Sequence, residues 1–262
     1  LMEVAENALY GTLGSWYGFK DKGTPIATVL ANRGCRAACT FCNVRTFNGV
    51  GVRHRSVESV LDELTILKNK YGVGHIIWLD DDLLHDEKRA IELFNGMAER
   101  NLDMTWDATN GLIAHSCNEE VIAAAVKSGA IGVFLGVETG NPEILKQIKK
   151  PGTVETFRKA AKVIRRYEEI HSRILLIIGF PDETLGKIFE TIDLVEEMDL
   201  DWCNIAILQP WKNTPLYDKM VEQGLVGEEG TLKGSTQEKK VAPYNLGPYS
   251  KQRALERGKL DL

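Results

Sequence analysis

Residues 26–42 read IATVLANRGCRAACTFC, a short apolar run followed by a loop that carries three cysteines. The run is too short and too continuously apolar for a surface helix, and this pattern is typical of a strand buried on both faces. Cys35, Cys39 and Cys42 have the spacing Cys-x3-Cys-x2-Cys. Three thiolates on one loop can hold three corners of a cubane iron–sulfur cluster, whereas electron-transfer clusters mostly use four. The fourth iron would keep an open position, which is typical of a catalytic metal.

The 262-residue chain has an ordinary globular composition, with 44% hydrophobic and 26% charged residues, and its length suits one large α/β domain. The net charge of −5 gives no electrostatic case for nucleic acid. No apolar run approaches the ~18 residues of a membrane span. Five cysteines, an odd number, are unlike a secreted disulfide framework, so we expect a cytoplasmic protein. The chain starts at Leu1 without an initiator methionine or a signal pattern, and we expect it to be an excerpt of a longer protein.

Apolar runs alternate with helix-like segments from about residue 25 to about residue 210. After the run at 26–31, the strand candidates are residues 75–79, 104–108, 131–137, 174–178 and 204–208. The segments between them have the 3.6-residue apolar spacing of helices, and Ser56, Asn118 and Asn141 precede three of them as expected N-caps. Six strand–helix repeats imply parallel strands with right-handed crossovers. The alternation fits a partial (β/α)6 barrel and an open doubly wound sheet equally well.

Polar or glycine-bearing turns follow the strand candidates. In parallel α/β architectures the ligand sites lie at the carboxyl ends of the strands. The cysteine loop follows the first candidate, the acidic turn Asp80-Asp81-Asp82 follows the second, Glu138 ends the fourth, and Gly179-Phe180-Pro181 follows the fifth. We therefore expect these groups to share one active-site face.

The cysteine loop and its companion turns resemble the radical S-adenosylmethionine (radical SAM) superfamily. The matching motifs, in order, are Arg-Gly-Cys-x3-Cys-x-Phe-Cys at 33–42, the acidic turn at 80–82, Gly-Val-Glu-Thr-Gly at 136–140 and Gly-Phe-Pro-Asp-Glu-Thr at 179–184. They are similar to a branch that includes cobalamin-associated, anaerobic-cyclase-like and methylthiotransferase-like enzymes. The resemblance covers roughly residues 25–225.

The resemblance implies a partial, TIM-like (β/α)6 barrel of parallel strands at residues 25–210. Residues 1–24 would then be an N-terminal arm or the end of a linker, and residues 211–262 a C-terminal extension. It also implies an oxygen-sensitive enzyme in which SAM binds the free iron of a 4Fe-4S cluster. One electron, from a donor such as flavodoxin or ferredoxin, would cleave SAM to methionine and a 5′-deoxyadenosyl radical. The radical would abstract hydrogen from a small-molecule or peptide substrate that the sequence does not identify.

Site roles follow from the resemblance, position by position. Cys35, Cys39 and Cys42 would ligate the cluster, and Phe41 would lie near the adenine. The turn Asp80-Asp81-Asp82 would receive the methionine ammonium, and Glu138 the ribose hydroxyls or the amino group. The backbone of Ile178-Gly179-Phe180-Pro181 would approach the adenine, because glycine permits close contact. Arg173 would pair with the SAM carboxylate.

Two alternatives stay open. A zinc site completed by His54 or Cys117 would explain the cysteines without SAM chemistry, and the chain would then be a non-catalytic iron–sulfur or zinc module. Within the enzyme class, the chain could be the core of a cobalamin-dependent methyltransferase or cyclase whose cobalamin domain lies outside it. The chain has no Asp-x-His-x2-Gly signature, so cobalamin is possible but unsupported here. Cys117 and Cys203 are expected to be inert core thiols.

The chain departs from the branch at two positions. Arg36 stands where proline commonly follows the first cysteine, and Asp182 stands where glycine commonly precedes Glu-Thr. Neither departure removes a cluster ligand, but each could alter the shape of its loop.

Overall fold

The computed structural model describes residues 24–226 and the two strand residues 244–245. The expected N-terminal arm therefore lies outside the described residues, apart from Thr24. Most of the expected C-terminal extension beyond residue 226 lies outside them as well.

Six parallel strands form the sheet of the protein. They are β1 (Ile26–Val29), β4 (His75–Trp78), β5 (Thr105–Leu112), β6 (Ala130–Glu138), β7 (His171–Ile178) and β8 (Trp202–Ile207). They pair in the order of the chain, β1-β4-β5-β6-β7-β8. A doubly wound sheet reverses its strand order at a switch point. The sequential order seen here therefore excludes the doubly wound sheet and confirms the partial barrel.

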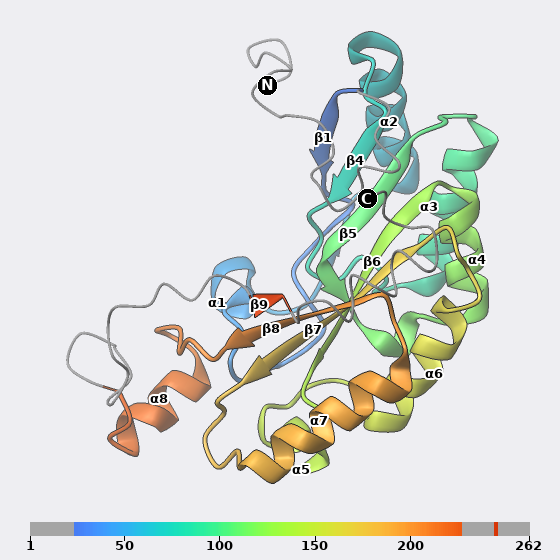
Figure 1. Ribbon diagram of the computed structural model, residues 1–262. Helices are drawn as coiled ribbons and strands as arrows, with labels where there is room; N and C mark the ends of the chain where they lie inside the picture. Colours follow the sequence, from blue (N-terminus) through green and yellow to red (C-terminus); the bar gives the residue numbers. More distant parts are fainter. Residues whose placement is uncertain (1–23, 227–243, 246–262) are drawn as a thin grey trace.

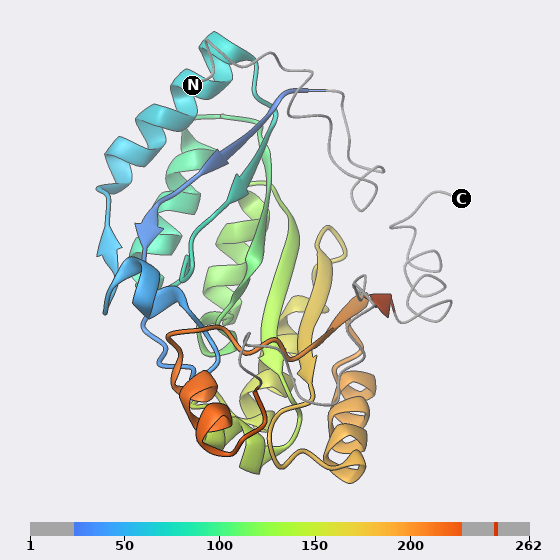
Figure 2. The ribbon, with the colours of Figure 1, turned by 90° about the vertical axis from the view of Figure 1, so that its left-hand side faces the viewer.

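The barrel is open on one side. Within the described residues β1 and β8 do not pair with each other, and the short strand β9 (Tyr244–Asn245) lies beside β8 in antiparallel orientation. Figure 2 shows the resulting curved sheet, with β1 at one edge and β8 at the other. The sequence analysis did not predict β9, because a two-residue strand carries no periodic signal.

Five helices cover the outer face of the sheet (Figure 1). They are α2 (Val57–Tyr71), α3 (Glu87–Glu99), α4 (Glu119–Lys127), α6 (Val154–Ile164) and α7 (Leu185–Met198). Ser56, Asn118 and Thr153 accept backbone hydrogen bonds at the starts of α2, α4 and α6, and so satisfy N–H groups that a helix start leaves free. Among the described residues, none of the helices is both long enough and apolar enough to cross a membrane.

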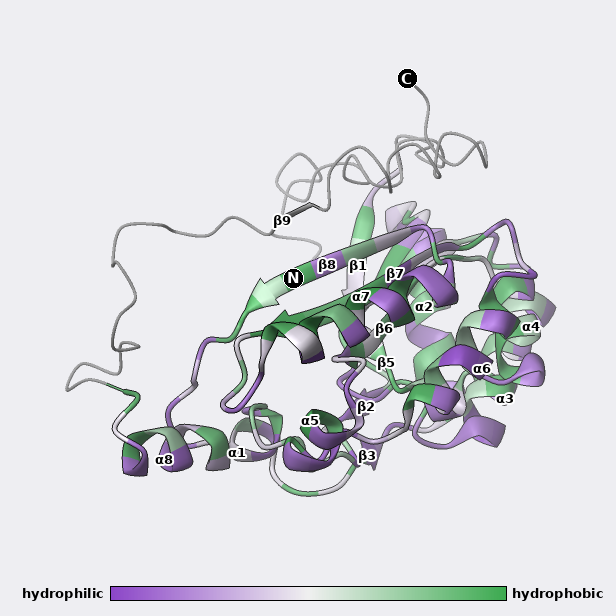
Figure 3. Ribbon diagram, turned by 60° about the horizontal axis from the view of Figure 1, so that its bottom comes forward, coloured by the Kyte–Doolittle hydropathy of each residue, from purple (hydrophilic) through white to green (hydrophobic). Residues whose placement is uncertain are grey.

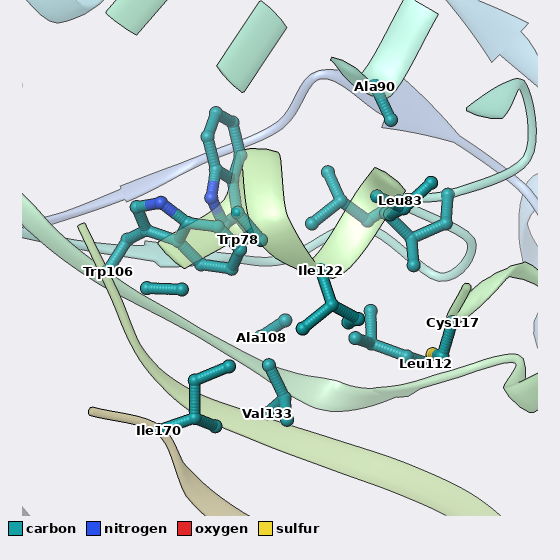
Figure 4. Packing of buried hydrophobic residues seen from close by; sticks show 14 of the residues in the cluster. Trp78, Leu83, Ala90, Trp106, Ala108, Leu112, Cys117, Ile122, Val133 and Ile170 are labelled. Atoms are coloured by element: carbon teal, nitrogen blue, oxygen red, sulfur yellow. The ribbon is translucent and has the colours of Figure 1, made fainter. Parts of the chain in front are cut away.

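The main core fills the space between the sheet and these helices. Trp78 and Trp106 meet edge to face with ring centroids 6.4 Å apart (Figure 4). Phe94 of α3 stacks on Trp106 at 5.0 Å. Cys117 and Cys203 are buried in this core, which confirms their prediction as core thiols. Hydrophilic residues recur along α6 (Figure 3). The burial of large aromatic rings fixes the strands whose carboxyl ends carry the site.

Short elements gather at the carboxyl ends of the strands (Figure 3). They are the hairpin of β2 (Asn32–Arg33) and β3 (Arg53–His54), then α1 (Val44–Asn48), the 3-10 turn Ala114–Ser116, α5 (Pro142–Gln147) and α8 (Pro215–Glu222). Asn141 caps α5 directly before Pro142, as expected. Helix α8 lies in the segment that the sequence suggested to be an extension, and it packs with α5 through Leu216, Met220 and Ile144.

Candidate active site at the cysteine loop

The acidic turn after β4 holds the start of the cysteine loop. The Asp80 carboxylate accepts hydrogen bonds from the backbone N–H groups of Ala31, at 3.1 Å, and Asn32, at 2.5 Å. Asp80 is buried, and this burial raises its pKa to about 6 although the two N–H donors favour the charged form. The sequence analysis gave Asp80 a role in binding the SAM ammonium, but the structure places its carboxylate on the protein backbone.

Arg36, the residue directly after the first cysteine, anchors the loop to the same turn. Its guanidinium binds both oxygens of Asp82, with Nε at 2.7 Å and Nη2 at 2.8 Å, and its own backbone N–H donates to Asp82 at 3.1 Å. Nη2 also donates to the Leu84 carbonyl at 2.6 Å. Proline at this position has neither the N–H nor the guanidinium. Arg36, at the position where the branch commonly has proline, therefore anchors the loop through hydrogen bonds that proline cannot make.

The far end of the loop is held by α5 and α8. The Thr40 N–H donates to the Ile148 carbonyl, and the Thr40 carbonyl accepts from the Leu216 N–H, both at 2.9 Å. Phe41 packs edge to face on Phe180, with centroids 5.9 Å apart. Segments more than a hundred residues apart in the chain therefore fix the loop between Cys39 and Cys42.

The three cysteines open onto one cavity of about 190 Å³, much more than the roughly 10–15 Å³ that a single water needs. The cavity is enclosed by the cysteine loop, α1 and the ends of β5 and β6. Its lining includes Cys35, Cys39, Phe41, Cys42, Arg45, Asp81, Asn110, Gly111, Gly136, Glu138 and Lys150. As predicted, one face of the sheet brings together the cysteines, Phe41, Asp81 and Glu138.

A buried ion pair forms one wall of the cavity. Lys150 Nζ lies 2.7 Å from Glu138 Oε1, and the two side chains are 10% and 11% exposed. Burial works against the charged ammonium, but the Glu138 carboxylate together with the nearby Cys39 and Cys35 raises the pKa of Lys150. Glu138 has φ +68°, and a Cβ on Gly136 would lie 2.8 Å from Lys150 Nζ, so the backbone here leaves space for the pair.

Lys150 was missed in the sequence analysis. It follows α5 and lies twelve positions after Glu138, so no helical or strand spacing links the two. The sequence signal available was the pair Lys149-Lys150, directly before Pro151 and Gly152 at the end of a short helix. Such a pair is not specific to a binding site. Arg45 of α1 was also missed, and its side chain lines the same cavity.

The donor set fits an iron–sulfur cluster. Cys35, Cys39 and Cys42 are free thiols, and thiolate sulfur is the ligand type that iron–sulfur clusters prefer. Without a metal, burial raises the pKa of all three thiols, that of Cys39 to about 12. Bound iron supplies the positive charge that keeps such thiols deprotonated.

The partners of the zinc alternative lie elsewhere. Cys117 is buried in the core and donates to the Ile113 carbonyl at 3.7 Å. His54 lies on β3 with Nδ1 3.0 Å from Asn32 Oδ1. Neither residue lines the cavity. In the part of the chain that the structure describes, no three His, Cys, Asp or Glu side chains are arranged around a single metal ion.

The remaining predicted residues lie outside the cavity lining. In the turn after β7, Gly179 has φ +91° and the N–H groups of Gly179 and Phe180 both bind Glu183, while the Ile178 carbonyl accepts from Leu208. This turn, with Pro181, reaches the loop through the contact of Phe180 with Phe41. Arg173 is buried near the start of β7, with its guanidinium 4.8 Å from the Phe134 ring centroid. That position is far along the strand from the cysteine loop.

A parallel barrel with three free thiols beside one cavity at its strand-end rim is the architecture that the fold and the site define. Residues 29–195 match the radical SAM superfamily. The chain belongs to this superfamily, whose enzymes use a 4Fe-4S cluster and SAM.

Named relatives include methyltransferases, cyclases and methylthiotransferases. An uncharacterized methyltransferase of Pyrococcus horikoshii is 33% identical over 79% of this chain and 45% of its own length. The anaerobic magnesium-protoporphyrin IX monomethyl ester cyclase of Cereibacter sphaeroides is 27% identical over 93% of this chain and 38% of its own. The chain thus spans less than half the length of these relatives.

A solved structure supports the fold. TsrM from Kitasatospora setae is a radical S-adenosylmethionine methyltransferase solved with cobalamin and a 4Fe-4S cluster bound. It superposes with a TM-score of 0.67 at 19% identity, over 76% of this chain and 40% of its own.

Proposed function

We propose that this chain is the SAM-cleaving core of a radical SAM enzyme that abstracts hydrogen from its substrate. The observation that carries the proposal is the cavity into which Cys35, Cys39 and Cys42 all open, together with the buried pair of Glu138 and Lys150. When bound, the 4Fe-4S cluster supplies one electron that breaks a carbon–sulfur bond of SAM.

The cavity offers a partner to each charged group of the SAM methionine. Asp81 lines the cavity and is held by Asn48 Nδ2 at 2.7 Å, which leaves a carboxylate oriented for an ammonium group. Arg45 and Lys150 are the cations of the lining and suit the carboxylate. This assignment replaces Arg173, because Arg173 lies on a part of β7 remote from the cysteines.

The adenosine end has apolar and backbone contacts available. Phe41 faces the cavity and is braced by Phe180. Gly111 has φ +90°, and both Gly111 and Gly136 leave backbone uncovered beside Glu138. The cavity is thus lined by α1, β5 and β6 together with the cysteine loop and the segments after β4 and α5, and such enclosure keeps water from a reactive intermediate.

A cobalamin-dependent methyl transfer or cyclisation is the second candidate for the whole protein. The similarity to methyltransferases and to TsrM, which was solved with cobalamin, supports it. An electron donor such as flavodoxin or ferredoxin and a reducing, cytoplasmic setting are part of both proposals.

The test is anaerobic reconstitution with iron and sulfide, followed by SAM and dithionite, with 5′-deoxyadenosine measured by chromatography. We expect 5′-deoxyadenosine from the wild-type protein and none from Cys39→Ala, with Cys117→Ala as the control that keeps the activity. A protein with full iron and sulfide content that forms none, with or without candidate substrates, would count against the proposal. Stoichiometric zinc without iron in anaerobically purified protein would contradict the cluster itself.

A further inference from the structure

The segment around the cysteine loop is basic, although the whole chain is acidic. Residues 22–57 contain no aspartate or glutamate, whereas the chain as a whole has a net charge of −5. Five arginines lie in this segment: Arg33, Arg36, Arg45, Arg53 and Arg55. This segment therefore differs in charge from the chain as a whole.

Three of these arginines have partners or positions inside the structure. Arg36 pairs with the acidic turn after β4, Arg55 Nη1 lies 2.5 Å from Glu63, and Arg45 lines the cavity. Arg33 and Arg53 are different, because both are exposed and neither has an ion pair among the described residues.

Arg33 and Arg53 are directly opposite each other in the hairpin of β2 and β3. Opposed residues of an antiparallel pair share a face, with Cβ atoms about 4.5–5.5 Å apart, and like charges in this arrangement are destabilising. The other pair of the hairpin, Asn32 and His54, is joined by a hydrogen bond of 3.0 Å. Two arginines at opposed positions do not stabilise the hairpin by their charge, and both side chains are exposed to a partner.

Two exposed apolar side chains adjoin these arginines. Phe47 of α1 is 86% exposed and Val50, in the loop that leads to β3, is 74% exposed. Arg53 Nη2 donates to the carbonyl of Asn48, directly after Phe47, at 2.5 Å. Arg33, Phe47, Val50 and Arg53 thus form one surface, the basic patch. Apolar centres flanked by arginine are typical of protein interfaces.

The basic patch is coupled to a cluster ligand by close backbone packing. Arg33 lies two residues before Cys35, and the residue between them, Gly34, has φ +91°. A Cβ on Gly34 would lie 2.3 Å from the carbonyl oxygen of Gly51, in the loop that carries Val50. A protein docked on the patch would therefore contact the segment that leads directly to the cluster.

We propose that the basic patch is the docking site of an acidic electron-carrier protein, such as a flavodoxin. This inference rests on the proposed function, which needs one electron from outside the chain. In the complex one electron passes from the flavodoxin hydroquinone, which becomes the semiquinone, to the cluster, and no bond forms or breaks. Transient redox complexes bury less than about 1,200 Å² in total, so a small patch is sufficient. Electrostatic attraction between the arginines and carboxylates of the carrier speeds the encounter.

The experiment measures reduction of the reconstituted full-length protein by flavodoxin hydroquinone in a stopped-flow spectrometer, at low and high ionic strength. For the wild type we expect a second-order rate constant that falls steeply with salt. For the double variant Arg33→Glu/Arg53→Glu we expect a rate about tenfold lower at low salt and nearly independent of salt. Calorimetric titration of the cluster-free protein with oxidised flavodoxin should show the same loss of affinity.

The matched control reverses two exposed lysines on the outer helices, Lys127→Glu on α4 and Lys162→Glu on α6. It changes the net charge by the same amount and should leave the rate within about twofold of wild type, because steering depends on where the charge lies. Phe47→Ser should weaken binding about fivefold and keep the salt dependence. Unchanged reduction rates in the Arg33/Arg53 variant would overturn the docking site, and so would an equal loss of rate in the lysine control. A second segment of the full-length chain that covers the basic patch would also overturn it.

Dithionite separates this inference from the proposed function. With dithionite as the reductant, the Arg33/Arg53, Lys127/Lys162 and Phe47 variants should form 5′-deoxyadenosine at the wild-type rate, because a small reductant does not need the patch. If the wild type forms none with dithionite, the proposed function fails. If dithionite works and the Arg33/Arg53 variant is reduced normally by flavodoxin, only the docking site fails.

Discussion

Replacing Lys150 with methionine should expose how much the cavity wall depends on its buried ion pair. The change keeps the aliphatic length but leaves the Glu138 carboxylate, which is 11% exposed, without its cation. Removal of one partner from a buried pair costs about 3–5 kcal/mol. The residual exposure of Glu138 favours the lower end, about 3 kcal/mol.

Urea unfolding of the cluster-free, reduced protein measures this loss. The double variant Lys150→Met/Glu138→Gln replaces the charged pair by an uncharged one and should recover most of the stability, to within about 1 kcal/mol of wild type. A single-variant loss below about 0.5 kcal/mol, the size of an ordinary surface substitution, would refute the reasoning.

Three further predictions concern the anchors of the loop and the space beside the pair. Arg36→Pro removes every hydrogen bond from this residue to the buried Asp82 and should cost about 3 kcal/mol of unfolding free energy and lower the iron retained after reconstitution; equal iron content would contradict the anchor. Asp80→Asn should reveal the raised pKa of Asp80, about 6 against 3.8. Because the folded state binds this proton more tightly, the stability of wild type relative to the variant should fall by about 3 kcal/mol as pH rises from about 4 to 6, and a flat difference would contradict it. Gly136→Ala should displace the ion pair and cost about 1–3 kcal/mol in urea unfolding, whereas Ala123→Gly on an exposed position of α4 should cost about 1 kcal/mol.

The sequence predicted the barrel because strand and helix signals were strong and local. Short apolar runs mark most of the strands, as in β6 and the second half of β7, and Ser56 and Asn118 mark helix starts by residue type alone. The choice between a barrel and a doubly wound sheet depends on strand order, which no local signal carries. Here the motif resemblance made the choice, and the pairing in chain order confirmed it.

The site was predictable in position and less so in detail. The carboxyl ends of parallel strands share one rim, so the cysteines, Asp81 and Glu138 meet as expected. The three aspartates of the acidic turn look alike in sequence, but the bend of the turn separates their roles. Asp80 binds the loop backbone, Asp82 binds Arg36, and only Asp81 of the three lines the cavity. Lys150 was missed because its partner is set by the path of the chain around α5.

The most direct test of the central claim is an electron paramagnetic resonance spectrum of the reduced protein before and after addition of SAM. If Cys35, Cys39 and Cys42 are the only protein ligands of a 4Fe-4S cluster, its fourth iron is open and SAM should change the g values of the signal. Cys203→Ala should behave like wild type, because that thiol is buried in the core. A 4Fe-4S signal that SAM leaves unchanged would contradict the account.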